Sequence, residues 1–194
     1  MPHATYADLF KPAAQSRAWI YDLALILGGS LVIGLCAQIS IPLPFSPVPI
    51  TAQTFAVLLV GVLLGYRRSG LCVATYLVEG FAGLPVFSNG GAGIAHLLGP
   101  TGGYLVGYLG AAMLVGWLAE RGWDRQFATT FLAMLLGNIV LYVSGLAWLS
   151  VFTGIERALP LGLYPFIPGD VLKIAIATAV VPLGWKFLVP LNHR

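Results

Sequence analysis

Charged side chains are scarce in this 194-residue sequence. Asp, Glu, Lys and Arg make up 9% of the residues and hydrophobic residues make up 58%, whereas soluble globular domains contain about 25% and about 45–50% of these classes. A water-soluble fold of this size could not bury so much apolar surface, which excludes that class of protein. Together with a mean hydropathy of +0.88, the composition predicts a single integral membrane domain over residues 1–194.

Cysteine and histidine are also rare, and neither forms a cluster. Cys36 and Cys72 each lie in an apolar run without a neighbouring Cys or His, so we expect ordinary packing and neither a metal site nor a disulfide framework. The sequence contains no H-E-x-x-H, G-x-S-x-G or Walker motif. We therefore predict no catalytic residue, no cofactor and no ATP hydrolysis by the chain itself.

Apolar runs of about 20 residues, the length that crosses a bilayer, recur along the chain. Breaking the sequence at charges, prolines and glycines predicts an all-α bundle of six transmembrane helices, at residues 19–39, 51–66, 70–87, 102–119, 127–152 and 169–189. The first run follows two basic residues, as in a signal peptide, but it is longer than the apolar part of a signal peptide and lacks an A-x-A cleavage site. We therefore interpret it as a retained span.

The ten basic residues form no stripe typical of nucleic-acid binding, but their positions orient the predicted helices. Eight fall on one side of the predicted membrane: Lys11, Arg17, Arg67, Arg68, Arg121, Arg125, Lys186 and Arg194. The connections on the opposite side contain only Arg157. Because Lys and Arg accumulate in short cytoplasmic segments, this pattern predicts an even number of crossings with both termini in the cytoplasm.

The predicted external connections are long and carry few charges. Residues 42–49 have proline at four of eight positions and cannot form a helix, and residues 84–101 are rich in glycine. We expect these loops to fold inward over an external cavity, because irregular backbone at membrane depth has to be buried in protein. Plain loops at the membrane surface are the alternative.

Three ionisable residues are predicted to lie at membrane depth, namely Glu79, Asp170 and Lys173. A charge at membrane depth is costly and therefore marks a functional candidate. Asp170 and Lys173 are three residues apart and share a helix face, so together they would offer an acceptor and a fixed cation to a small polar or anionic solute. Alternatively, Asp170 caps the helix and Lys173 extends to the external surface. For Glu79, a pocket role and an interfacial position are equally compatible with the sequence.

The fifth predicted helix carries two further polar candidates. Asn138 and Tyr142 are four residues apart, one turn along the same face. Either they line a pocket, or Asn138 bonds a neighbouring helix and Tyr142 anchors the helix at the membrane interface.

Several motifs on the predicted external side occur together in an order typical of one family. They are PLPFSPVPITAQT (42–54), GLPVFSNGGAG (83–93), LLGPTGGYLVGY (97–108), GNIVLYVSGLAWL (137–149) and PGDVLK (168–173). By these motifs the chain resembles the biotin-specific S components of energy-coupling factor transporters, the BioY family. The resemblance covers most of the chain and implies biotin uptake across the cytoplasmic membrane of a prokaryote by a six-helix S-component bundle.

The resemblance also implies binding residues. The acid and the lysine of the family's sixth helix correspond to Asp170 and Lys173, which would accept a hydrogen bond from a ureido N–H of biotin and donate one to an oxygen. Further candidates, from motif position and residue type, are Phe87, Tyr104, Tyr142, Gln53, Asn89 and Asn138.

Partner proteins are implied in the same way. The family implies a transmembrane T component, separate ATPase subunits and, for some members, a homo-oligomer. Small residues of the first helix would dock on the T component, here Ala24 and Gly28, although Gly28 departs from an all-alanine pattern. Two other hypotheses are a self-sufficient secondary carrier and an intramembrane enzyme acting on a lipid.

Overall fold

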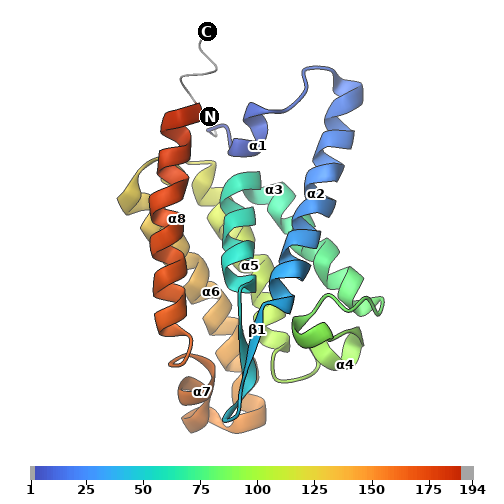
Figure 1. Cartoon of the computed structure of the whole chain (residues 1–194), viewed down its shortest axis with the longest axis vertical. Coiled ribbons are helices and arrows are strands. Elements are labelled where there is room, and N and C mark those ends of the chain that lie inside the picture. The colour runs from blue at the N-terminus through green and yellow to red at the C-terminus, as the bar shows by residue number, and fades with distance from the viewer. Residues whose placement is uncertain (1–2, 189–194) are drawn as a thin grey trace.

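The chain folds into a bundle of long apolar helices, described by a computed structural model that covers residues 3–188 (Figure 1). Five helices in this range are long and apolar enough to cross a membrane. They are α2 (Gln15–Gln38), α3 (Gln53–Phe81), α5 (Gly102–Ala119), α6 (Phe127–Thr153) and α8 (Ile167–Leu188). The predicted bundle of membrane helices is thus confirmed. Helix α5 has the predicted bounds, 102–119. The predicted end of the last helix, residue 189, lies outside the described residues.

Helix α3 is folded back on itself at Gly65. The φ of Gly65 is +80° with a ψ of 179°, a backbone conformation that only glycine adopts readily. Gln53 Nε2 donates to the hydroxyl of Tyr76 over 2.5 Å, although 23 residues of straight helix would span about 35 Å. The two helices predicted at 51–66 and 70–87 are therefore two arms of one element. The second arm ends at Phe81 and not at residue 87, because the chain turns at Gly83 with a φ of +97°.

The predicted external loops contain short elements that the sequence did not predict. Strands β1 (Ser40–Leu43) and β2 (Ser46–Thr51) pair antiparallel, so the fold is not purely helical. Both strands of a two-stranded sheet are edge strands, which is where proline is tolerated. The other short elements are the 3-10 helix η1 (Ser88–Gly90), α4 (Gly93–Leu97) and α7 (Ile155–Gly162).

The two ends of the bundle differ in charge. The β1–β2 hairpin, α4 and α7 lie at one end, and α1 (Tyr6–Leu9) lies at the other, as does the bend of α3 (Figure 1). At the α1 end, Arg68 forms ion pairs with Asp8 at 2.7 Å and with Asp22 at 2.8 Å. Arg125 of η2 (Trp123–Arg125) donates to the backbone carbonyl of Ala4 at this same end.

The core lies where α3, α5 and α6 pack closely through small residues. A Cβ added to Gly61 would lie 2.8 Å from the carbonyl oxygen of Ala112, and one added to Gly116 would lie 2.5 Å from the backbone of Gly65. Such close backbone approach is typical of membrane helices. Helix α2 packs at the edge of this core and exposes many large apolar side chains, as a helix facing lipid does.

Candidate ligand-binding site

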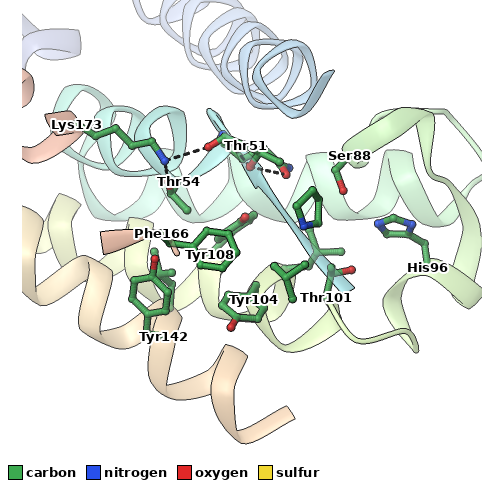
Figure 2. Close-up of a pocket in the computed structure, with 15 residues that line it drawn as sticks. Thr51, Thr54, Ser88, His96, Thr101, Tyr104, Tyr108, Tyr142, Phe166 and Lys173 are labelled. Carbon is green, nitrogen blue, oxygen red and sulfur yellow. Dashed lines mark hydrogen bonds between the residues drawn. The ribbon is translucent and has the colours of Figure 1, made fainter. Parts of the chain in front are cut away.

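A cavity lies among the ends of the helices and strands at the β1–β2 end of the bundle (Figure 2). It encloses about 480 Å³ of space, including its open mouth. Side chains from β2, α3, η1, α4, α5, α6 and α8, and from the connections just before α5 and α8, surround it: Val48, Pro49, Thr51, Gln53, Thr54, Ser88, His96, Thr101, Tyr104, Leu105, Tyr108, Leu141, Tyr142, Phe166 and Lys173. The β1–β2 hairpin covers part of the cavity, as expected of loops that fold inward.

Lys173 provides a fixed positive charge at one side of the cavity. Its ammonium donates to the backbone oxygen of Thr51 at 3.0 Å, to Thr54 Oγ1 at 2.7 Å and to Asp170 Oδ1 at 3.1 Å. These three bonds use all three N–H donors of a lysine. The alternative in which Lys173 extends to the external surface is therefore not seen.

Asp170 stands behind Lys173 and is only 6% exposed. Besides Lys173, its carboxylate accepts hydrogen bonds from the hydroxyls of Thr54, at 3.4 Å, and Tyr142. The contact between Asp170 and Lys173 expected from their spacing is present as an ion pair at 3.1 Å. A buried charge is tolerated only when it is paired and hydrogen-bonded, and both members of this pair meet that requirement.

Three tyrosines line the middle of the cavity, two from α5 and one from α6. The rings of Tyr104 and Tyr142 meet edge to face, with centroids 6.1 Å apart. The hydroxyl of Tyr104 donates to the backbone oxygen of Gly162 at 2.8 Å and so ties α5 to α7. A Cβ on Gly145 would lie 2.4 Å from the Tyr104 ring, which means that this glycine makes room for the aromatic wall.

Neutral polar groups occupy the other side of the cavity. Ser88, His96 and Thr101 lie opposite Lys173 (Figure 2). Burial lowers the pKa of His96, which favours its neutral form. Its ring stacks on buried Phe87 with centroids 5.1 Å apart.

Gln38, at the end of α2, holds this side of the cavity in place. Its side-chain nitrogen donates to the backbone oxygens of Pro85 and Phe87, at 3.3 and 3.1 Å. Its side-chain oxygen accepts from the N–H of Gly90 at 3.1 Å. A single amide therefore replaces the regular backbone pairing that this loop lacks.

The structure brings together only some of the residues predicted to bind a ligand. Gln53, Tyr104, Tyr142 and Lys173 line the cavity, and Asp170 supports Lys173 from behind. The remaining three predicted residues do not line the cavity. Phe87 is buried behind His96, and Asn89 is exposed in η1 with a φ of +56°. Asn138 lies one turn of α6 before Tyr142 and lines a separate, narrow gap between helices.

The other sequence candidates lie away from the cavity. Glu79 accepts a hydrogen bond from Ser30 of α2. Ala24 and Gly28 are on the exposed face of α2, and a Cβ on Gly28 would meet no atom of the described chain within 4 Å. Cys72 is buried and Cys36 is half-buried, and the described residues contain no group of His, Cys, Asp and Glu that could hold a metal ion.

Sequence reasoning missed several cavity residues. Tyr108 lies four residues after Tyr104 on the same helix face, so the helical period could have indicated it. Thr51 and Thr54 stand at the junction of β2 and α3, and their role depends on a strand that was not predicted. His96 lies in a glycine-rich connection, where no period places its side chain, so the sequence gives no sign that it faces the cavity.

The cavity suits a small solute with polar ends and an apolar middle. A cation backed by a carboxylate stands at one side, aromatic rings lie between, and neutral polar groups stand at the other side (Figure 2). Such a site can bind and orient a ligand through hydrogen bonds and ring contacts.

Several known proteins are similar to this chain in sequence. The BioY family profile matches residues 9–189. The biotin transporter BioY of Thermotoga maritima is 39% identical over 173 residues, which cover 89% of this chain and 95% of the relative. Biotin transporter BioY2 of Lactococcus lactis subsp. cremoris is 35% identical over 176 residues, which cover 90% and 93% of the two chains.

A solved structure agrees with these relatives. The crystal structure of the S-component for biotin from an ECF-type ABC transporter superposes with a TM-score of 0.79 and 29% identity, over 90% of this chain and 95% of that one. The profile, the relatives and the fold thus point to one assignment, and the chain belongs to the BioY family.

Proposed function

We propose that this chain binds biotin and serves as the substrate-specific S component for biotin uptake across the cytoplasmic membrane of a prokaryote. The observation that carries the proposal is the ion pair of Asp170 and Lys173 beside the tyrosine wall. Biotin has a ureido group with two N–H donors and a carbonyl, an apolar bicyclic ring and tail, and a terminal carboxylate. The cavity offers chemistry to match each part.

In this proposal seven of the eight predicted residues have a defined role. Lys173 donates to an oxygen of biotin, and Asp170 accepts from a ureido N–H or holds Lys173 in place. Tyr104 and Tyr142 pack against the ring and tail, and Gln53 adds a polar contact. Phe87 and Asn89 act through the loop that carries them, because neither lines the cavity.

The proposal includes six membrane crossings with both termini in the cytoplasm. The two arms of α3 count as two crossings, and the other four candidate spans bring the number to six. The basic residues support the orientation, because Arg68 and Arg125 lie at the same end of the bundle as α1. That end is expected to face the cytoplasm.

Transport requires partner proteins in this proposal. The S-component neighbour comes from an ECF-type ABC transporter, which supports a transmembrane T component and separate ATPase subunits. Ala24 and Gly28 are proposed to dock on the T component, because small residues on an exposed helix face let another helix approach closely. The named relatives are transporters, which argues against the intramembrane enzyme.

Equilibrium binding of labelled biotin to the detergent-purified protein tests the proposal. We expect saturable binding for the unaltered protein and a strong loss for Asp170→Ala, because Lys173 would lose its carboxylate partner. Glu79→Gln is the matched control, since Glu79 is another acid within a helix but contacts Ser30 and not the cavity. Absence of saturable binding, or normal binding by Asp170→Ala, would contradict the proposal.

A further inference from the structure

Helix α2 is the least buried of the five long helices. In its most apolar 18-residue stretch, 22% of the residues are buried, against 61% in α3 and 67% in α5. It stands at the edge of the bundle (Figure 1), and none of its described residues lines the ligand cavity. Because little packing holds α2 in place, it can move relative to the core at a lower cost than the other helices.

Polar side chains fasten α2 to the rest of the bundle near both of its ends. At the α1 end, Asp22 forms the ion pair with Arg68 at 2.8 Å. Between the ends, Ser30 donates a hydrogen bond to Glu79. Gln38 is the last residue of α2 and provides hydrogen bonds at the cavity end. Movement of this end of α2 therefore has to break or carry along the contacts of Gln38.

The side chain of Gln38 attaches α2 to the wall of the ligand cavity. Its amide forms three hydrogen bonds with the backbone of residues 85–90. Ser88 of this stretch lines the cavity, and Phe87 supports the ring of His96, which lines the cavity as well (Figure 2). A helix that does not touch the cavity is thus connected to its neutral polar side through one amide.

We propose that Gln38 couples the position of α2 to the wall of the ligand cavity. In the seated position seen in the structure, Gln38 holds residues 85–90 in place, and with them Ser88 and the support of His96. When the cavity end of α2 moves away from the core, this stretch loses its anchor and the ligand loses contacts with the wall. Gln38 is then a positioning residue, because it acts through the backbone of residues 85–90 without touching the ligand.

This coupling provides a route from the surface of α2 to the bound ligand. It rests on the proposed function, in which biotin occupies the cavity and a partner docks on Ala24 and Gly28. These two residues lie 14 and 10 residues before Gln38, about 21 and 15 Å along the helix. A partner that displaces α2 would weaken biotin binding. Because coupling between two sites is reciprocal, bound biotin has to favour the seated position of α2 by the same factor.

Cys72 is a native reporter for the position of α2. Its side chain is fully buried, and a Cβ on Gly29 of α2 would lie 2.6 Å from its Sγ. Helix α2 therefore covers this sulfur, and a thiol reagent reaches it only when α2 lifts or the chain unfolds. In a Cys36→Ala background, Cys72 is the one cysteine of the chain. Saturating biotin should slow the labelling of Cys72 in detergent-purified protein several-fold.

Gln38→Met in this background removes the hydrogen bonds but keeps the length of the side chain. Without biotin, Cys72 should be labelled several-fold faster than in the presence of Gln38, and saturating biotin should no longer protect it. Trp148→Phe is the matched control, because the Trp148 indole donates to the backbone oxygen of Gly99 at 2.9 Å. That bond fastens the same connection between α3 and α5 to α6 and not to α2, so biotin should still protect Cys72 in this variant.

A second buried position separates movement of α2 from global unfolding. Val115 is fully buried where α3, α5 and α6 pack, and Cβ atoms on Gly61 and Gly137 would lie 3.2 and 2.6 Å from its side chain. In a chain whose native cysteines are both replaced by alanine, the thiol of Val115→Cys should react more slowly than Cys72. Gln38→Met should leave its rate unchanged. Equal rates at the two positions would show that α2 does not move separately from the core, which would overturn the inference.

The main chain offers a competing route, because β1 begins at Ser40, directly after α2, and Val48 and Thr51 of the hairpin line the cavity. If biotin still protected Cys72 in Gln38→Met, the coupling would run through the hairpin and the inference would fail. It would also fail if biotin bound but left the labelling of Cys72 unchanged without this substitution. Failure of the unaltered protein to bind biotin would instead remove the proposed function, while the ligand-free labelling of Gln38→Met would still test the role of Gln38.

Discussion

Tyr104 is the residue that ties the aromatic wall of the cavity to α7. Its hydroxyl donates to the backbone oxygen of Gly162 at 2.8 Å in a buried position. Tyr104→Phe keeps the ring but leaves that oxygen unpaired, which should lower the free energy of unfolding by about 1–3 kcal/mol. Thermal unfolding in detergent should show a reduced Tm.

Tyr164→Phe is the comparison for this variant, because the Tyr164 side chain is 56% exposed. Loss of an exposed hydroxyl should leave the Tm nearly unchanged, since water replaces the lost bond. Equal Tm values for the two variants would show that the bond to Gly162 contributes nothing to stability.

At the residue scale, the predicted residues that line the cavity all lie in regular helices, although Tyr108 of α5 was missed. Asp170 and Lys173 stand out as charges within an apolar run, and a spacing of three places them on one face. Phe87 and Asn89 lie two residues apart in an irregular loop, yet one is fully buried and the other is exposed. No period relates neighbouring side chains in such a loop, so motif position could not separate them.

Among the elements, α3 depends most on a single residue. Gly65 has a φ of +80°, and a Cβ there would lie 2.6 Å from Glu120 Oε1. Gly65→Ala should therefore lower the free energy of unfolding by about 1–3 kcal/mol through backbone strain alone, with an added steric cost. Chemical or thermal unfolding in detergent would measure the loss.

Gly28→Ala is the matched control, because a Cβ at Gly28 meets no atom of the described chain within 4 Å. Alanine is the better helix former by about 1 kcal/mol, so this variant should be as stable as the unaltered protein or more stable. If Gly65→Ala matched Gly28→Ala in stability, the bend of α3 would not require glycine.

At the element scale, the lengths of the apolar runs predicted where the helices lie, but they did not predict the structure of the connections between helices. The pair of basic residues at 67–68 indicated a break near the right place, whereas the actual turn is at Gly65 and depends on contacts with Glu120. The β1–β2 hairpin was missed because proline disfavours strands in general. Its position is fixed by tertiary contacts, such as Ser46 Oγ donating to the backbone oxygen of Leu161 at 2.7 Å.

At the scale of the whole molecule, the proposed orientation in the membrane rests on a difference between the two ends of the bundle. Ion pairs of Arg68 and Lys11 with Asp8 and Asp22 gather at the α1 end. The β1–β2 hairpin, α4 and α7 lie at the opposite end (Figure 1), where residues of β2 and α4 help to line the cavity. A substrate taken up from outside has to meet the cavity end first, which is the orientation that the basic residues also favour.

Labelling of single cysteines in whole cells tests both the orientation and the number of crossings. With Cys36 and Cys72 replaced by alanine, a membrane-impermeant maleimide should label Phe45→Cys in intact cells, because Phe45 is 59% exposed in the hairpin between β1 and β2. Arg67→Cys, at the exposed bend of α3, should react only after the cells are permeabilised. Labelling of both positions from outside would mean that the first arm of α3 does not cross the membrane, and the reverse pattern would invert the orientation. Because positions 45 and 67 are separated only by β2 and that arm, this pair tests the crossing on which the count of six depends.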